Sequence, residues 1–171
     1  MVLALYMLFD RTGAGLPALC CVALHECGHI AAMHLVGARV TDLQFCAFGV
    51  RMKKQGLLSY GQEAAVYFGG AAANLAVLAA VFPFAGWNLF TTANAALAVF
   101  NLLPVGRLDG GVLLHLLLCR AGGLERADLL RRVIGFVILT PLFAGGFWLL
   151  MRGNCTLLFT AVYLAVTLLC T

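Results

Sequence analysis

The chain has 171 residues, of which 63% are hydrophobic and only 11% charged, and its mean hydropathy is +1.00. This number of charged side chains is too small to cover the surface of a water-soluble globule. The composition therefore argues against a soluble fold and indicates that much of the chain lies in lipid. The formal net charge is +4, but the basic residues fall in short loops between apolar runs rather than along one face. No nucleic-acid partner is therefore expected.

Apolar runs long enough to cross a bilayer, about 17–25 residues each, alternate with charged or turn-rich breaks. The first nine residues, Met1 to Phe9, are apolar but too short to cross. We interpret them as part of a truncated first span rather than as a signal peptide, because no basic segment precedes them. Five further spans are predicted at 16–36, 62–82, 87–104, 133–151 and 154–170. The sequence thus predicts an all-α polytopic membrane protein with about six transmembrane helices, the first truncated, in a single domain over 1–171.

Two longer breaks between the spans carry most of the basic residues. The segment 37–61 is rich in β-forming residues and alternates in part, which predicts a small β-hairpin or sheet at the membrane surface. The segment 121–132 predicts a short amphipathic stretch that lies in the interface. Nine of the eleven Lys and Arg residues lie in 37–61 and 105–132. The positive-inside rule therefore predicts that both breaks, and both termini, face the cytoplasm.

The span 16–36 contains the motif His25-Glu26-Cys27-Gly28-His29. Residues four apart on a helix differ by about 40° around its axis, so both imidazoles project from one face and can bind a single Zn²⁺ ion. Glu26 follows the first histidine and can take a proton from a water molecule at the metal. Ionisable side chains inside a membrane span are costly unless paired or hydrated, so they mark a functional site. We predict His25 and His29 as zinc ligands and Glu26 as the catalytic base.

A catalytic zinc site needs a third protein ligand, and Asp109 is the best candidate among the remaining acidic residues. It ends the segment Asn101-Leu-Leu-Pro-Val-Gly-Arg-Leu-Asp109, and two glycines follow it. Proline in a helix interior frees a carbonyl group, and glycines permit sharp turns, so this segment predicts a broken helix that faces a polar cavity. The alternative is an ordinary loop aspartate.

Other polar residues have roles that the sequence leaves open. The helix phase turns Cys27 away from the flanking histidines, which favours packing over ligation. His34 lies near the predicted cytoplasmic end of its span, and His115 follows Asp109 by six residues. For both histidines, packing is the alternative to metal ligation. The seven cysteines show no repeated Cys-x-x-Cys spacing, so no disulfide framework is expected.

The combination of His-Glu-x-x-His in one span with Asn-x-x-Pro-x-x-x-x-Asp-Gly in a later one resembles the site-2 protease family of intramembrane zinc metalloproteases. The segment Gly69-Gly70-Ala-Ala-Ala-Asn74 is similar to the family's Gly-x-x-x-Asn helix. The compact segment 100–111 is most similar to the stage IV sporulation protein FB branch, and no PDZ or CBS domain is expected. The resemblance implies that His25, His29 and Asp109 bind zinc, that Glu26 is the general base, and that Asn101 and Asn74 contact the substrate.

The resemblance also implies a function. The chain is expected to be a zinc metalloendopeptidase that hydrolyses a peptide bond in or near the membrane segment of a membrane-associated protein. The branch implies a sporulation sigma-factor precursor as substrate, regulatory membrane proteins as further partners, and a bacterial cell membrane with the active site toward the cytoplasm. Two alternatives stay open: a metal-ion transporter, because intramembrane His and Glu also line ion paths, and a catalytically inactive membrane chaperone of the same fold.

Overall fold

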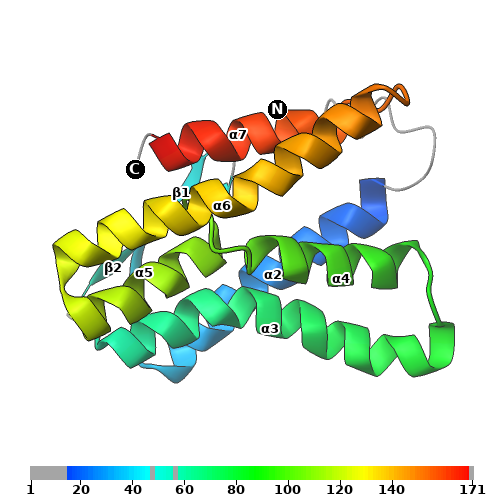
Figure 1. Ribbon diagram of the computed structural model, residues 1–171. Helices are drawn as coiled ribbons and strands as arrows, with labels where there is room; N and C mark the ends of the chain where they lie inside the picture. Colours follow the sequence, from blue (N-terminus) through cyan, green and yellow to red (C-terminus); the bar gives the residue numbers. More distant parts are fainter. Residues whose placement is uncertain (1–14, 47–48, 56–57, 170–171) are drawn as a thin grey trace. The chain divides into compact units, whose positions relative to one another are not determined.

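The computed structural model describes the backbone of residues 15–46, 49–55 and 58–169, and that part of the chain forms six helices and two strands (Figure 1). Clustering of contacts divides the chain into two compact units, Met1–Phe100 and Asn101–Thr171. The predicted truncated span at 1–9 lies outside the described residues.

From residue 15 onward, the first unit contains three helices: α2 (Gly15–Leu35), α3 (Tyr60–Ala85) and α4 (Leu89–Asn101, whose last residue opens the second unit). They correspond to the predicted spans 16–36, 62–82 and 87–104. α3 begins at a capping box, in which the Ser59 hydroxyl accepts a bond from the Gln62 backbone and the Gln62 side chain accepts one from the Ser59 backbone. Such a cap satisfies backbone donors that a helix start otherwise leaves without partners.

Two strands connect α2 to α3, within the segment 37–61 whose residues favour β-structure. They are β1 (Arg39–Cys46) and β2 (Gly49–Gln55), paired antiparallel from Arg39 opposite Gln55 to Cys46 opposite Gly49. The register shifts between Val40 and Asp42. The two strands form a sheet of their own with no third partner among the described residues.

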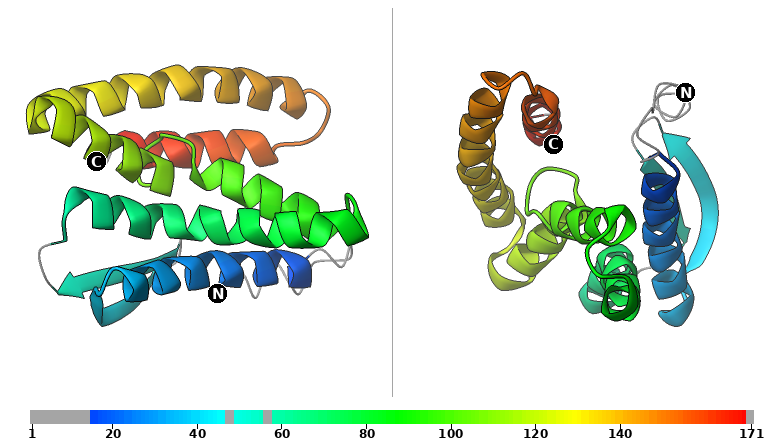
Figure 2. Two further views of the ribbon diagram at one scale, coloured as in Figure 1. Left: turned by 90° about the horizontal axis from the view of Figure 1, so that it is seen from below. Right: turned by 90° about the vertical axis from the view of Figure 1, so that its right-hand side faces the viewer.

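The backbones of α2 and α3 approach closely, and the two helices run side by side (Figure 2). A Cβ atom at Gly28 would collide with the carbonyl oxygen of Gly69, and a Cβ atom at Gly69 would lie 2.7 Å from both the carbonyl oxygen of Gly28 and the methyl group of Ala32. Lipid tails are as apolar as leucine, so helices in a membrane associate largely through such small-residue contacts. This packing holds the histidine-bearing helix against α3.

Replacing Gly69 with alanine is expected to lower the free energy of unfolding by about 1–3 kcal/mol, because the added methyl group overpacks the α2–α3 contact. Unfolding in mixed detergent micelles, followed by circular dichroism, measures the change. Gly145→Ala in α6 is the control, since a Cβ there meets only Leu157 at an ordinary 3.5 Å. Equal losses in the two variants would contradict the proposed role of the contact.

The second unit consists of α5 (Asp109–Gly122), α6 (Leu124–Leu150) and α7 (Thr156–Leu169). α6 packs against both of the others. Figure 2 shows α6 and α7 lying side by side, and a Cβ at Gly135 of α6 would lie 2.9 Å from the Leu168 side chain of α7. The absence of a side chain at Gly135 therefore lets these two helices meet.

The segment 121–132, predicted as a short amphipathic stretch in the interface, is helical at both ends. Residues 121–122 end α5, and residues 124–132 are the first turns of α6, which continues without interruption to Leu150. Within 124–132, Ala127 and Arg131, one turn apart, are buried and the other residues are exposed, so this part of α6 has one packed face. α5 lies in the segment 105–132, which the sequence analysis treated as a break between spans.

Within the described ranges, three helices are long and apolar enough to cross a membrane: α2, α3 and α6. α4 and α7 are shorter apolar helices of 13 and 14 residues. Many large apolar side chains on these helices are exposed, as in Phe84, Val137 and Phe159 at 92%, 66% and 70%. Apolar exposure on this scale suits a lipid environment and supports an integral membrane protein with several spans.

Candidate metal centre

The two motif histidines of α2 face each other on its buried side. His25 and His29 are 5% and 9% exposed, and their Nε2 atoms are 3.2 Å apart. Two imidazole nitrogens bound to one tetrahedral zinc ion, each at about 2.0–2.1 Å, are separated by roughly 3.4 Å. The pair therefore has the spacing of two ligands of a single zinc ion.

A carbonyl group of α3 orients one of these rings. The Nδ1 atom of His29 lies 2.8 Å from the carbonyl oxygen of Val66. A carbonyl oxygen only accepts hydrogen bonds, so Nδ1 carries the proton and donates it, which leaves the lone pair of Nε2 available for a metal. Metal-binding histidines usually have such a partner on their second nitrogen.

Gly70 of α3 lies directly against the two rings. A Cβ atom at this position would be 2.5 Å from Nε2 of His29 and 2.7 Å from Nε2 of His25. Only glycine therefore leaves room for both nitrogens. Gly70 was noted in the sequence as part of a glycine-rich segment but was not predicted as a site residue, because the spacing of one helix cannot identify which residue of another helix faces it.

The residues between the histidines have less contact with the interior. Glu26 is half-buried and directly follows His25 on α2. Cys27 is exposed, which confirms the prediction that the helix phase turns it away from the histidines. His34 is exposed at the last turn of α2, about one and a half turns beyond His29.

A buried polar cluster lies one turn before His25. The Asn74 amide donates to the carbonyl oxygen of Cys21 at 3.4 Å, and the Asn94 amide donates to the Cys21 sulfur at 3.0 Å and to the Phe90 carbonyl oxygen at 2.9 Å. Both asparagine side chains are fully buried at 0% exposure. These bonds join α3 and α4 to α2 at the turn that precedes the first histidine, so they position that turn.

Asp109 belongs to the second unit, where it is the first residue of α5. The segment 102–108 bends over the first turn of α5, with Gly106 at a φ of +55°, which glycine adopts without strain. A Cβ at Gly110 would collide with the Leu102 carbonyl group, so the bend needs a glycine there too. The predicted break in the helix after Asn101 is confirmed. Asp109 is the acidic residue in the first turn of α5, where negative charge interacts favourably with the helix dipole.

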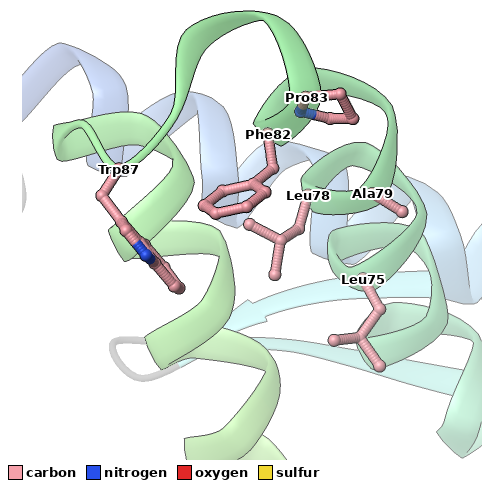
Figure 3. Close-up of a pocket in the computed structure, with 6 residues that line it drawn as sticks. All are labelled: Leu75, Leu78, Ala79, Phe82, Pro83 and Trp87. Carbon is pink, nitrogen blue, oxygen red and sulfur yellow. The ribbon is translucent and has the colours of Figure 1, made fainter.

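An apolar cleft of about 420 Å³ lies elsewhere in the first unit, where α3 leads into α4 (Figure 3). It is lined by Leu75, Leu78, Ala79, Phe82, Pro83 and Trp87. The rings of Phe82 and Trp87 meet edge to face, with centroids 4.9 Å apart. None of the lining side chains can bind a metal or exchange a proton, so this cleft is not the candidate site.

Comparison with known proteins gives a fold. No protein-family model matches the chain, and no curated protein sequence matches it either. Among solved structures, the chain is similar to a site-2 protease from Methanocaldococcus jannaschii, with a TM-score of 0.69 and 17% sequence identity over 96% of this chain and 81% of that one. The chain therefore has the fold of a site-2 protease.

Proposed function

We propose that this protein is an intramembrane zinc metalloendopeptidase that cleaves a membrane-associated protein in or near its membrane segment. The observation that carries the proposal is the pair of buried imidazoles on α2, with Nε2 atoms 3.2 Å apart and Glu26 between them in the sequence. The likeness in fold to a site-2 protease supports an intramembrane protease. Zinc is the metal that best suits nitrogen and carboxylate donors beside an open position for water.

Three protein ligands are proposed for the zinc ion: His25, His29 and Asp109. Two imidazoles and one carboxylate form a common ligand set of catalytic zinc sites. Asp109 lies at the N-terminus of α5, a position that suits a negatively charged ligand. The chemistry that zinc supplies when bound is polarisation of the scissile carbonyl group and a lower pKa of a water molecule.

Glu26 is proposed as the general base. Its carboxylate takes a proton from the attacking water and later delivers it to the leaving amine, so one residue serves both steps. Val66 holds the His29 ring with Nε2 directed away from its carbonyl, and the apolar environment of α2 excludes bulk water, which strengthens the electrostatic interactions at the site.

Substrate binding is proposed at two places. Asn101, half-buried at the end of α4, offers an amide to the backbone of an extended substrate. Asn74 is less suited to that role, because it is fully buried and donates to the Cys21 carbonyl, so we propose that it positions α2. The free edges of the β1–β2 pair provide backbone groups for an added strand, which would hold a substrate segment that has unwound from its helix.

The membrane arrangement is part of the proposal. α2, α3 and α6 are long enough to cross by themselves, and about six crossings are proposed in all. The basic loops are proposed to lie on the cytoplasmic side by the positive-inside rule. A sigma-factor precursor is the proposed substrate class, and the bacterial cell membrane the proposed location.

Substituting Asp109 with asparagine is expected to lower the zinc affinity of the purified protein by at least about 100-fold, because a neutral amide replaces a charged ligand. Mutation of a residue that only supports a ligand already lowers metal affinity by about 10–100-fold. Metal analysis after dialysis at defined free zinc measures this. Glu125→Gln, an equivalent loss of charge in the first turn of α6, is the control and should bind as the wild type does. Unchanged zinc affinity in Asp109→Asn would exclude this residue as a ligand and remove the three-ligand site from the proposal.

A further inference from the structure

A second pair of metal-binding side chains lies within the second unit, on α5. The Nε2 atom of His115 is 3.4 Å from the Sγ atom of Cys119, which follows one helical turn later. Donor atoms of a histidine and a cysteine bound to one tetrahedral zinc ion, at about 2.0–2.1 Å and about 2.3 Å, are separated by roughly 3.5 Å. The two side chains therefore already have the spacing of ligands of one metal ion.

A residue of the adjacent helix faces the other nitrogen of the same ring. The Nδ1 atom of His115 lies 3.5 Å from an Oδ1 atom of Asp128 on α6, and Nη2 of Arg131 lies 3.7 Å from that oxygen. The contact between Nδ1 and Asp128 is electrostatic and not a hydrogen bond. A carboxylate on this side of the ring favours the tautomer with the proton on Nδ1, in which the lone pair of Nε2 faces the thiol. A carboxylate behind a histidine is the usual arrangement at zinc sites. The Arg131 guanidinium is only 8% exposed, so the carboxylate of Asp128 lies between a buried cation and the imidazole of His115.

The location on the helix decides between a metal ligand and a reactive thiolate. Cys119 lies in the last turn of α5, and its carbonyl group accepts the cap bond from Gly123. The C-terminal end of a helix is electronegative, so it stabilises a cation bound there. A nucleophilic cysteine would instead be favoured at a helix N-terminus. The local field thus favours a bound cation over a reactive anion.

We propose that His115 and Cys119 form a second metal site, which binds a thiophilic divalent transition metal such as zinc, with Asp128 as the residue that orients His115. One thiolate and one imidazole suit zinc and related metals and not calcium or magnesium. Two protein ligands leave the remaining coordination positions to water, so the site exchanges its metal with the medium. His115 and Cys119 are both half-buried, which gives the metal access. The site requires none of the residues of the proposed catalytic centre.

Cobalt(II) titration of the full-length protein in detergent tests the proposal without any activity measurement. Cobalt bound to a thiolate produces an intense charge-transfer band in the near ultraviolet, and cobalt bound only by His25, His29 and Asp109 does not. We expect this band in the wild type and in His29→Ala, and its loss in both Cys119→Ser and His115→Ala. Cys155→Ala, which removes an exposed free cysteine of the same unit, is the control and should keep the band.

The Asp128→Asn variant tests the orienting role, with an expected loss of cobalt affinity of about 10–100-fold. Circular dichroism of each variant shows whether the helices are retained. Absence of the band in the wild type, its persistence in Cys119→Ser, or its loss in Cys119→Ser but not in His115→Ala would overturn the proposal. Loss of the band in His29→Ala would also overturn it, since the metal would then belong to the other centre.

Discussion

Replacing Glu26 with glutamine is expected to reduce cleavage of a membrane-embedded substrate by at least about 100-fold, because general acid–base catalysis contributes about 10²–10⁴-fold. Glutamine has the size of glutamate but cannot take the proton of the attacking water. The carboxylate is not among the proposed zinc ligands, so the zinc content of the purified variant should equal that of the wild type. Co-expression with candidate membrane-tethered transcription-factor precursors, followed by immunoblotting, measures cleavage.

Glu63→Gln is the matched control for this experiment, because it makes the same change in the first turn of α3 and should cleave normally. Cleavage retained in Glu26→Gln would exclude the assigned role. Loss of zinc together with cleavage would instead make Glu26 part of the metal site or of its support. A wild-type protein that cleaves no candidate but moves zinc into proteoliposomes would favour a transporter, and one that does neither would favour an inactive chaperone.

Replacing Gly70 with alanine is expected to lower zinc affinity by a factor on the order of 100 and to reduce cleavage in parallel. The new methyl group would lie 2.5 Å from Nε2 of His29 and 2.7 Å from Nε2 of His25, so at least one ring must move. Metal–ligand distances tolerate only about 0.2 Å of change. A displaced imidazole would move its nitrogen outside that range. Equilibrium zinc binding, measured by competition with a chromogenic chelator, gives the affinity.

Gly61→Ala provides a control on the same helix, because a Cβ atom there meets nothing within 4 Å. Alanine favours helices over glycine by about 1 kcal/mol, so both variants should keep their helical circular dichroism. Wild-type zinc affinity in Gly70→Ala would show that α3 does not pack against the metal-binding nitrogens in the way described.

Much of the fold followed from local patterns in the sequence. Hydropathy predicted α2, α3 and α4, and each of these helices coincides with a predicted apolar span. Pro104 and the glycines that follow it predicted the break before Asp109. α5 and the start of α6 escaped prediction for a physical reason. The apolar run of α5 is too short to span, and the charged first turns of α6 resemble a surface segment, although Ala127 and Arg131 are buried.

The sequence by itself determined which chemistry is available: two imidazoles one helical turn apart with a carboxylate beside them, in a chain too apolar for water. This information is local, since a helix repeats every 3.6 residues and each side chain's direction follows from its position. Only the tertiary structure decided what faces those groups. The residues that face them belong to neighbouring helices: Val66 behind His29, Gly70 against both rings, and Asp128 behind His115. Helix packing decides which residues these are, and it depends on side-chain shape over the whole contact.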